Sequence, residues 1–283
     1  MLSPEINIGT DLSYFECDDR SFVPSDFADD INLLSKRTAK ISLIIPVFQE
    51  EKILETTLTK YTEELQSKYS FEVIVSDGGS TDKTVDIAKK YSQKITIHSE
   101  NHKQTISEGR NKGADIAEGD VLVFMNGDTY PADLERFFEF VYNWTCGNSH
   151  YKDCQALTCW VSVEPNDIRF KDKMFYAIHN RYIKFLNFIG LGMGRGECQI
   201  VRKEYFHQVG GYDEKLAAGE DFDLFKRLAK ISKIGFVSDL IVYESPRRFR
   251  KYGYFKVIMS WLFNSIFVIL YGKSSSDDWE PVR

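Results

Sequence analysis

The sequence predicts an α/β protein in which a mostly parallel central sheet is flanked by helices, with a helical extension at the C-terminus. Apolar, β-branched runs alternate with stretches of helical periodicity over about 90 residues, as in a parallel sheet whose strands are joined by helices. Several runs end in polar residues and glycine, and open α/β sheets bind ligands at such strand ends. Apolar residues make up 43% of the 283 residues, which is enough for one large domain.

The first half carries the alternating pattern. Strands and helices are expected in turn at residues 41–47, 50–67, 71–75, 83–91, 95–97, 107–118 and 121–125. The helical stretches place their apolar residues on one side, so each can pack against a sheet. This half is therefore expected to form the parallel part of the sheet.

The second half is less regular. We expect strands at residues 156–163, 198–201 and 234–237, and helices at residues 171–189, 219–230 and 254–271. A glycine-rich loop covers residues 190–196, and a basic loop follows residue 245. The chain is therefore expected to comprise an acidic extension over residues 1–39, a main domain over residues 40–245, and the basic loop with an apolar helix over residues 246–283.

Charge and cysteine content narrow the class of protein. A net charge of -6 argues against a general nucleic-acid binder, whose binding face would be basic. The five cysteines are odd in number and form no C-x-x-C pair, which favours reduced thiols. No basic start followed by an apolar run opens the chain, so no signal peptide is visible. We therefore expect a cytoplasmic protein that does not bind nucleic acid.

The first candidate site follows the strand at residues 71–75. Asp77 ends the apolar run, Gly78 and Gly79 follow, and Ser80 to Asp82 open a helical pattern. This is a strand, a tight turn and a capped helix. A carboxylate at the ligand-binding end of a strand is a good acceptor for a donor group of a base or ribose. The alternative is an ordinary strand–helix turn in which these polar side chains only cap the helix.

Two further positions fit the same edge of the sheet. Asp128 ends Asn126-Gly127-Asp128 after an apolar strand, and a lone carboxylate there is a natural ligand for Mg²⁺ or Mn²⁺. Such cations often take one or two protein carboxylates and complete their shell with substrate phosphates. Capping of the turn before Pro131 is the alternative. Arg110 can pair with a phosphate or with Asp77, or it is a plain surface arginine.

An acidic cluster opens the helix expected at residues 219–230. Glu220, Asp221 and Asp223 lie in its first turn, where negative charge suits the helix dipole, so capping is one explanation. Three acids in four residues exceed what capping needs. One of them is a candidate general base.

Together these motifs resemble glycosyltransferase family 2, a group of inverting nucleotide-sugar transferases with the Rossmann-like GT-A fold. The family segments P-x-[YF]-[NQ]-E, D-[DG]-G-S-T-D and R-N-x-G are matched at residues 46–50, 77–82 and 110–113. The D-x-D, G-G-[FY]-D-E and E-D motifs are matched at residues 126–128, 210–214 and 220–221. The resemblance covers residues 40 to 245, and it implies a donor-binding half over residues 40–130 and an acceptor-binding half over residues 131–245.

The resemblance implies a role for each matched residue. Contacts to the donor are expected from Pro46, Val47, Phe48, Glu50, Asp77, Gly78, Gly79, Arg110, Asn126, Gly127, Asp128, Arg247 and Arg248. Asp128 would bind Mg²⁺ or Mn²⁺ on the diphosphate, and Asp221 would deprotonate the acceptor. The acceptor side is expected at Gly194, Arg195, Gly196 and Glu220.

The chain departs from the family pattern at two positions. Asn126 stands where D-x-D has its first acid, so metal binding depends on fewer charges, and Gly78 removes one carboxylate near the ribose. The carbonyl oxygen of Asn126 can still ligate a cation or bond a ribose hydroxyl. The arginine-rich segment at residues 245–251 is similar to an S-x-R-R segment in a subset of these transferases.

The implied function is metal-dependent transfer of a sugar, with inversion, from a UDP- or GDP-sugar to an acceptor hydroxyl or a lipid phosphate. A cation at Asp128, with Arg247 or Arg248, would stabilise the charge of the leaving diphosphate. The alternatives are a nucleotide-sugar-binding protein without catalysis, which Asn126 favours, and a retaining transferase of the same fold. A nucleotidyltransferase would need a glycine-rich phosphate loop after the first strand, and residues 46–50 do not provide one.

The apolar helix expected at residues 254–271 allows two interpretations. It carries Lys256, Ser260 and Asn264 on one stripe, and a basic cluster precedes it. An amphipathic helix beside basic residues suits an anionic membrane surface, which would place the protein at the inner face of the membrane with a lipid-linked acceptor. The alternative is a helix that packs on its own domain or at a homodimer interface.

Overall fold

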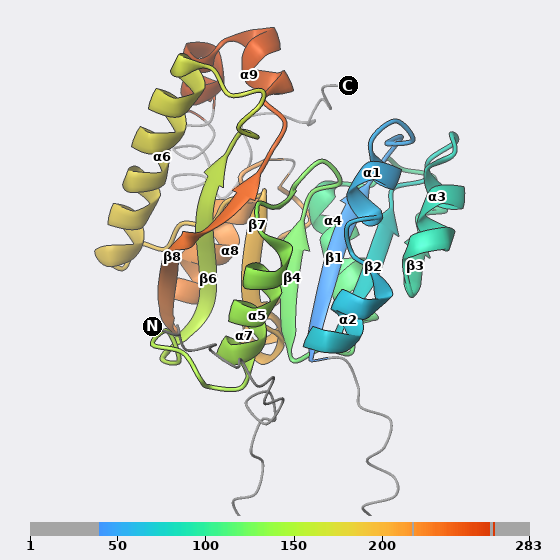
Figure 1. The fold of residues 1–283 in the computed structure, drawn as a ribbon, viewed down its shortest axis with the longest axis horizontal. Coiled ribbons are helices and arrows are strands. Elements are labelled where there is room, and N and C mark those ends of the chain that lie inside the picture. The colour runs from blue at the N-terminus through green and yellow to red at the C-terminus, as the bar shows by residue number, and fades with distance from the viewer. Residues whose placement is uncertain (1–39, 217, 261–262, 264–283) are drawn as a thin grey trace, which may run out of the picture. The chain divides into compact units, whose positions relative to one another are not determined.

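A computed structural model describes residues 40–216, 218–260 and 263. Within them the strands form one eight-stranded sheet in the order β3-β2-β1-β4-β7-β6-β8-β5 (Figure 1). The strands are β1 (Ile41–Val47), β2 (Phe71–Asp77), β3 (Lys94–Ile97), β4 (Val121–Met125), β5 (Tyr130–Pro131), β6 (Cys154–Ser162), β7 (Cys198–Arg202) and β8 (Lys233–Tyr243). The predicted acidic extension and most of the predicted C-terminal helix lie outside the described residues.

Helices precede or follow most strands. They are α1 (Leu54–Leu58), α2 (Glu63–Tyr69), α3 (Thr84–Tyr91), α4 (Ile106–Asp115), α5 (Leu134–Thr145), α6 (Phe170–Phe188), α7 (Lys203–Gln208), α8 (Glu220–Ala229) and α9 (Arg247–Tyr252). A further helical stretch covers residues 254–260. The α/β fold class is confirmed.

The first half of the sheet is parallel, as expected. β1 pairs in parallel with β2 and β4, and β2 pairs in parallel with β3. Val47 lies opposite Asp77 at the ends of β1 and β2, and Ile44 lies opposite Phe124 near the end of β4. The polar segments that follow these three strands therefore start at the same edge of the sheet.

The second half of the sheet is mixed, which the sequence pattern did not specify. β7 runs antiparallel to both β4 and β6, whereas β8 runs parallel to β6. The short strand β5 pairs antiparallel with the end of β8, and Tyr130 lies opposite Tyr243. This pairing brings the chain just after Asp128 beside the chain that leads into α9.

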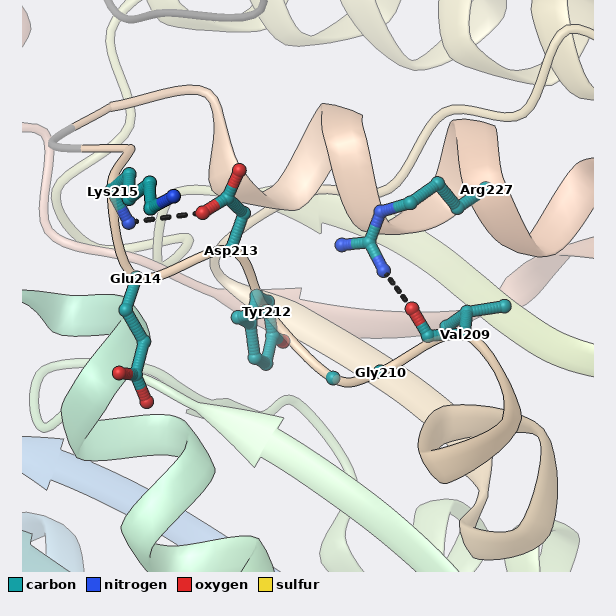
Figure 2. Close-up of a pocket in the computed structure, with 8 residues that line it drawn as sticks. Val209, Gly210, Tyr212, Asp213, Glu214, Lys215 and Arg227 are labelled. Carbon is teal, nitrogen blue, oxygen red and sulfur yellow. Dashed lines mark hydrogen bonds between the residues drawn. The ribbon is translucent and has the colours of Figure 1, made fainter.

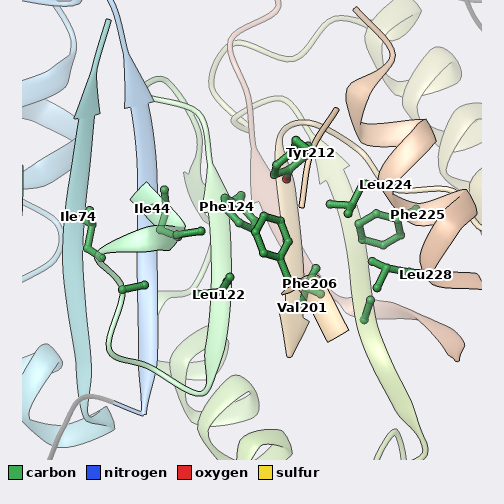
Figure 3. Close-up of a cluster of buried hydrophobic side chains, with 13 residues drawn as sticks. Ile44, Ile74, Leu122, Phe124, Val201, Phe206, Tyr212, Leu224, Phe225 and Leu228 are labelled. Atoms are coloured by element: carbon green, nitrogen blue, oxygen red, sulfur yellow. The ribbon is translucent and has the colours of Figure 1, made fainter. Parts of the chain in front are cut away.

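Apolar side chains hold helices against both faces of the sheet. On one face, Phe124 of β4 packs with Phe206 of α7 and Phe225 of α8 in a buried cluster (Figure 3). On the other face, Phe71 of β2 stacks on Phe138 of α5 with ring centroids 3.9 Å apart. Burial of each such side chain contributes roughly 1.5–3 kcal/mol, so these contacts hold the helices on the sheet.

Several boundaries differ from the sequence predictions. The single helix expected at residues 50–67 is two helices, because the Thr62 side chain accepts a hydrogen bond from the Leu65 amide and starts α2 anew. The segment at residues 110–113 lies inside α4 rather than at its start, since α4 begins after the capping box of Thr105 and Glu108. The expected basic loop is the helix α9.

Other elements were missed or extended. α5 and α7 were not predicted, and β8 is longer than the expected strand at residues 234–237. Cys154, Cys159 and Cys198 are free thiols as expected, but Cys146 is disulfide-bonded. The prediction that every cysteine is reduced is therefore wrong at Cys146.

Candidate active site

The loops that follow β1 and β2 are joined by side-chain hydrogen bonds. The Gln49 amide donates to Ser80 Oγ at 2.8 Å, and the Glu50 amide donates to Thr84 Oγ1 at 2.8 Å. Gln49 adopts a positive φ of 55°, which turns the chain between Phe48 and Glu50. The helix-opening Ser and Thr residues thus hold the predicted donor loop as well as the turn in which they lie.

The ends of β1, β2 and β4 approach one another closely, as the donor-site prediction requires. The Gly78 amide donates to the Val47 carbonyl at 2.8 Å. A Cβ on Gly78 would lie 3.4 Å from Phe48, and one on Gly127 would lie 3.3 Å from Val47. Small residues at both positions let the segments after the three strands pack together at the end of β1, where Pro46 and Val47 lie.

Asp77 has one oxygen engaged and one unengaged. Its Oδ2 accepts hydrogen bonds from the amides of Gly79 at 2.9 Å and Ser80 at 2.8 Å. Its Oδ1 is buried and has no hydrogen-bond partner within the described part of the chain. A buried acceptor without a partner costs roughly 1–3 kcal/mol, so a ligand N–H at this oxygen would be favoured.

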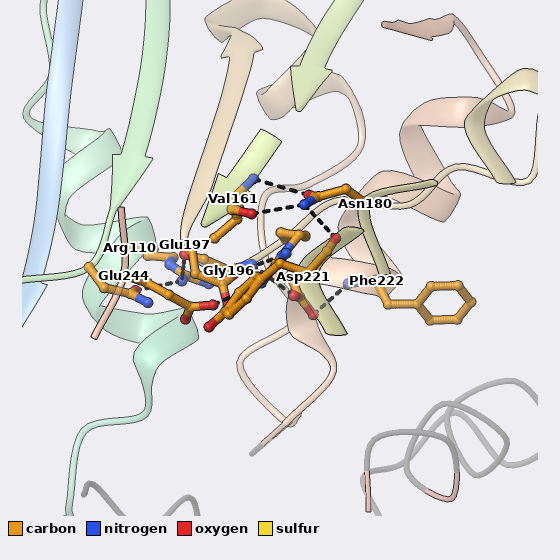
Figure 4. Close-up of polar contacts among 11 residues, drawn as sticks. Arg110, Val161, Asn180, Gly196, Glu197, Asp221, Phe222 and Glu244 are labelled. Carbon is orange, nitrogen blue, oxygen red and sulfur yellow. Dashed lines mark hydrogen bonds and ion pairs between the residues drawn. The ribbon is translucent and has the colours of Figure 1, made fainter. Parts of the chain in front are cut away.

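Arg110 lies at the centre of the site and is completely buried. Its guanidinium donates to Glu220 Oε1 at 2.9 Å and to Asn126 Oδ1 at 3.1 Å. It also donates to the carbonyl of Gly196 at 2.8 Å, and Figure 4 labels Arg110 and Gly196. The interpretations of Arg110 as a surface arginine and as a partner of Asp77 are both wrong. Arg110 instead connects the end of β4 with the loop before β7 and the start of α8.

Asp221 lies next to this hub at the N-terminus of α8. Its Oδ2 accepts from the Gly196 amide at 2.9 Å, and its Oδ1 accepts from the Phe222 amide at 2.8 Å. Burial and then the charge of Glu220 raise the pKa of Asp221 to about 7, against the opposing pull of Arg110. The two hydrogen bonds fix this carboxyl in position, and a pKa of about 7 lets it exchange a proton near neutral pH.

Asp128 is held by an arginine that follows the predicted main domain. Arg247 of α9 donates to Asp128 Oδ2 at 2.9 Å, and both side chains are partly exposed. The β5–β8 pairing described above creates this contact. Arg248 is the next residue of α9 and is partly exposed as well.

The donor set at Asp128 fits a cation that is carried mainly by a substrate. No group of three or more His, Cys, Asp or Glu side chains in the described residues is arranged to hold a metal ion. Asn126 already uses its Oδ1 for Arg110, which leaves Asp128 as the carboxylate ligand. Mg²⁺ and Mn²⁺ sites that use one carboxylate plus phosphate oxygens need no more than this.

Arg195, one of the predicted acceptor-side residues, forms a second ion network beside the first, with Glu197 and Glu244. Arg195 is 3% exposed and donates to both oxygens of Glu197 and, at 3.0 Å, to Glu244. Burial opposes the effect, but the Arg195 charge lowers the pKa of Glu197 to about 2. Burial and the charge of Glu197 raise the pKa of Glu244 well above its usual value, against the pull of Arg195. Arg195 thus fixes the loop that presents Gly196.

The glycines of the loop at residues 190–196 allow close packing against α8. A Cβ on Gly194 would lie 2.4 Å from the Phe225 ring, and one on Gly196 would lie 3.3 Å from the Arg110 guanidinium. Glu220 is 7% exposed and is occupied by Arg110. Gly196 and Glu220 therefore lie beside Asp221, and Gly194 packs on Phe225 one turn further along α8.

Some residues of the site were missed by the sequence interpretation. Gln49 and Thr84 take part in the hydrogen bonds that join the loops after β1 and β2. Glu197 and Glu244 are the acidic partners of Arg195. A signal was present in both cases, since Gln49 lies within a predicted motif and Glu197 follows the glycine-rich loop directly. Glu244 could not be found this way, because its partner lies 49 positions away.

A surface pocket of about 490 Å³ lies around the G-G-[FY]-D-E segment (Figure 2). It is lined by Val209, Gly210, Gly211, Tyr212, Asp213, Glu214, Lys215 and Arg227. No predicted donor, metal or base residue is among them, so the candidate site is defined by the strand ends and not by this pocket. Within the described ranges, no helix has both the length and the apolar character needed to cross a membrane.

Known proteins resemble this chain over its main domain. A glycosyltransferase AglE of Haloferax volcanii is 35% identical over 101 residues, which are 34% of this chain and 33% of the relative. A dolichyl N-acetyl-alpha-D-glucosaminyl phosphate glucuronosyltransferase of Methanococcus voltae is 35% identical over 97 residues, which are 32% of this chain and 30% of that protein. The chain thus spans about a third of the length of these relatives.

A solved structure shares the fold. The mannosyltransferase PcManGT of Pyrobaculum calidifontis, solved in complex with GDP-Man and Mn²⁺, superposes with a TM-score of 0.57 at 16% identity. The match covers 83% of this chain and 71% of that one. The GT-A fold expected from the motifs is therefore confirmed.

The family model described as glycosyl transferase family 2 matches residues 42–210. The matched range includes every predicted donor residue of the first half and the Gly194–Gly196 loop, and it ends before Asp221 and Arg247. Because this match covers more than half of the chain, the chain belongs to glycosyl transferase family 2.

Proposed function

We propose that this protein transfers a sugar, with inversion, from a UDP- or GDP-sugar to the hydroxyl of an acceptor, or to a lipid phosphate, with Asp221 as the general base. The observation that carries the proposal is the set of hydrogen bonds made by the buried Arg110 guanidinium. A single buried guanidinium bonds Asn126, two residues before the predicted metal ligand, and the Gly196 carbonyl, while the Gly196 amide bonds Asp221. The donor diphosphate and the base are thereby held in one rigid arrangement.

The donor would bind across the ends of β1, β2 and β4. The buried Oδ1 of Asp77 is suited to accept an N–H from the base. Gly78 and Gly79, in the turn beside it, would complete the nucleoside side of the site. Pro46, Val47 and Glu50 line the adjoining loop, and Gly127 lets the backbone approach the diphosphate. We assign no purine or pyrimidine preference, since both present an N–H donor.

The diphosphate would displace Arg247 from Asp128. A Mg²⁺ or Mn²⁺ ion bound by Asp128 and diphosphate oxygens would neutralise charge on the leaving group. Arg247, released from Asp128, and Arg248 beside it would add positive charge from α9 to the same oxygens. The mannosyltransferase of similar fold was solved with GDP-Man and Mn²⁺, which supports a divalent cation in this role.

The proposed transfer step uses Asp221 as the base and the nucleoside diphosphate as the leaving group. Asp221 takes the proton of the acceptor hydroxyl as that oxygen forms a bond to the anomeric carbon. The bond from this carbon to the diphosphate oxygen breaks, and the oxygen leaves with the electron pair. Attack from the face opposite the leaving group inverts the configuration. A pKa near 7 lets Asp221 be ionised for the reaction and still accept a proton.

The acceptor side would be formed by Gly194, Arg195, Gly196 and Glu220. The ion pairs of Arg110 and Arg195 would hold these residues in place. The relative from Methanococcus voltae acts on a dolichyl-linked phosphate by its name, which supports a lipid-linked acceptor for this chain. Such an acceptor fits a cytoplasmic protein at the inner membrane face. The predicted contact of residues 254–271 with a membrane, and the alternative homodimer, both stay predictions, since only residues 254–260 and 263 of that segment are described.

The test is a thermal-shift screen of UDP-, GDP- and dTDP-sugars with and without Mn²⁺, followed by product analysis. We expect one donor to raise the melting temperature, and to do so more strongly with Mn²⁺. Slow release of the nucleoside diphosphate with that donor would exclude a binding protein without catalysis. The anomeric configuration of the product by NMR would separate inversion from retention, and a retained configuration would contradict the single-displacement mechanism.

A further inference from the structure

The helix α6 exposes more large apolar side chains than an ordinary surface helix. Its buried positions are a mixture of polar and apolar residues: Asp172, Tyr176, Asn180, Ile183 and Asn187. The outward positions carry a stripe of large apolar side chains with exposed fractions between 47% and 86%: Phe170, Met174, Ile178, Tyr182, Phe185, Phe188 and Ile189. A surface helix normally turns such a stripe towards the core, so this exposed stripe calls for an apolar partner.

The inner face explains why the helix cannot simply rotate. Asn180 donates to the Val161 carbonyl at 2.8 Å and accepts from the Val161 amide at 3.0 Å, which ties the middle of α6 to β6 (Figure 4). Asn187 makes the same pair of bonds with Met193. A rotation that buried the apolar stripe would break these buried hydrogen bonds, and each unsatisfied group would cost about 1–3 kcal/mol. The hydrogen bonds of Asn180 and Asn187 therefore keep the apolar stripe on the outer side of α6.

The charges beside the stripe all have one sign. Lys171, Lys173, Arg181 and Lys184 are exposed, and the sole acid of α6, Asp172, is 1% exposed and ion-paired with Arg250 at 3.1 Å. The whole chain carries a net charge of -6, so this basic face is a local feature. Two copies of such a face would repel each other, whereas an anionic surface would attract it.

We propose that the outer face of α6 docks on the surface of an anionic lipid bilayer. An apolar stripe bordered by Lys and Arg, on a helix of 19 residues, is the pattern of helices that lie in the membrane interface. The aromatic rings enter the boundary of headgroups and acyl chains, and the four basic side chains meet lipid phosphates. This face is separate from the segment at residues 254–271, although Tyr254 packs against Phe175 and so starts that segment beside α6.

Docking through α6 would bring the active site close to the membrane. α6 leads directly into the loop at residues 190–196, which ends at the Gly196 contact with Asp221. At the other end of α6, Arg250 of α9 bonds Asp172, and α9 also carries Arg247. Both ends of the docking helix thus connect to the site, so a lipid-linked acceptor could be taken from the bilayer. This last step rests on the proposed function, whereas docking itself does not.

The experiment is vesicle flotation of the full chain without donor. Vesicles of phosphatidylcholine alone are compared with vesicles that contain phosphatidylglycerol, at low and high salt. We expect the chain to float with the anionic vesicles and to be released by high salt. Reversal of Lys171, Lys173, Arg181 and Lys184 to Glu should abolish flotation, since each basic residue contributes about fivefold to binding. Reversal of the exposed Lys89, Lys90, Lys103 and Lys152 matches the charge change and should leave flotation intact.

A second pair of variants tests the apolar stripe. Ile178→Ser with Phe185→Ser should lower the bound fraction at least tenfold. Ile97→Ser with Ile231→Ser changes two comparably exposed apolar residues elsewhere and should not. Circular dichroism and the donor thermal shift confirm that each variant is folded. Flotation is measured without donor. It therefore tests membrane docking even if the proposed sugar transfer is wrong.

Three results would overturn the proposal. The first is a wild-type chain that does not float with anionic vesicles. The second is α6 variants that float as well as wild type, which would assign membrane contact to another segment. The third is a wild-type dimer in the absence of lipid that the Ile178→Ser, Phe185→Ser variant converts to a monomer, which would assign the stripe to a second copy of the chain.

Discussion

At the scale of single residues, the site depends on how Asp221 is made basic enough to accept a proton. Its position at the start of α8 would by itself favour the ionised form, because helix N-termini stabilise negative charge. Burial and the neighbouring Glu220 outweigh this effect and bring the pKa to about 7. Proton transfer at neutral pH is thus a property of the pair Glu220 and Asp221, which are adjacent in sequence.

The Glu220 contribution can be measured. Glu220→Gln removes a negative charge beside Asp221, so the pKa of Asp221 should fall. Since the base must be ionised, the acid limb of kcat/KM, expected near pH 7 in the wild type, should move to lower pH. Asp223→Asn, in the same turn but ion-paired with Arg227 at 2.6 Å, should leave the limb in place. Equal movement of the limb in both variants would contradict the assigned role of Glu220.

A second residue-scale prediction concerns Arg247. Its guanidinium occupies Asp128 in the structure, so Arg247→Ala should raise the affinity for Mn²⁺ alone by about 2–5-fold, the value of a partly exposed ion pair. The same variant should weaken binding of the donor with Mn²⁺, because a cation is lost from the diphosphate. Electron paramagnetic resonance of free Mn²⁺ measures the first effect. Lys251→Ala, on the same helix, is the control and should change neither affinity.

At the scale of elements, α4 shows how close packing and helix propensity act on neighbouring glycines. A Cβ on Gly113 would lie 2.4 Å from Ile44 of β1, whereas one on Gly109 would have its nearest neighbour at an ordinary 3.5 Å. Gly113→Ala should therefore destabilise the fold by about 1–3 kcal/mol, and Gly109→Ala should stabilise it by about 0.5–1 kcal/mol. Urea unfolding measures both. A Gly113→Ala protein as stable as wild type would show that α4 does not pack on β1 this closely.

Elements also differ in how far the sequence could predict them. The strands at residues 41–47 and 121–125 were predicted with their observed bounds, because continuous apolar runs bounded by polar residues leave little choice. The helix at residues 50–67 was predicted too long, since its apolar period continues through the break that Thr62 caps. The helix α9 was predicted as a loop, because Phe249 is the main apolar residue in its basic sequence. The contacts that bury Phe249 include Phe175 and Tyr176 of α6, far away in the sequence.

At the scale of the whole molecule, Arg110 joins the two halves of the domain. Its partners Asn126, Gly196 and Glu220 lie 16, 86 and 110 positions away, so no local pattern could reveal that this arginine is buried. The donor strand ends and the base were proposed from short motifs in the sequence, and their roles stay predictions. The sequence could not predict the connection between them, which exists only in the folded chain.

The Arg110 connection predicts a defined loss of stability. Arg110→Ala leaves Glu220 buried without its partner and should cost about 3–5 kcal/mol in the free energy of unfolding. Arg110→Met combined with Glu220→Gln removes both charges and should recover part of this loss. Chemical denaturation of the two variants compares them. A double variant no more stable than Arg110→Ala would show that the ion pair is not the source of the effect.

The most direct test of the proposed function compares Asp221→Asn with wild type for one donor. The donor is chosen by thermal shift, and release of the nucleoside diphosphate is followed with Mn²⁺ and membrane lipids as acceptor source. The side chain of Asn has the same shape but cannot take a proton, so we predict an unchanged thermal shift and a rate at least about 100-fold lower. Turnover equal to wild type in Asp221→Asn would contradict the assignment of Asp221 as the base.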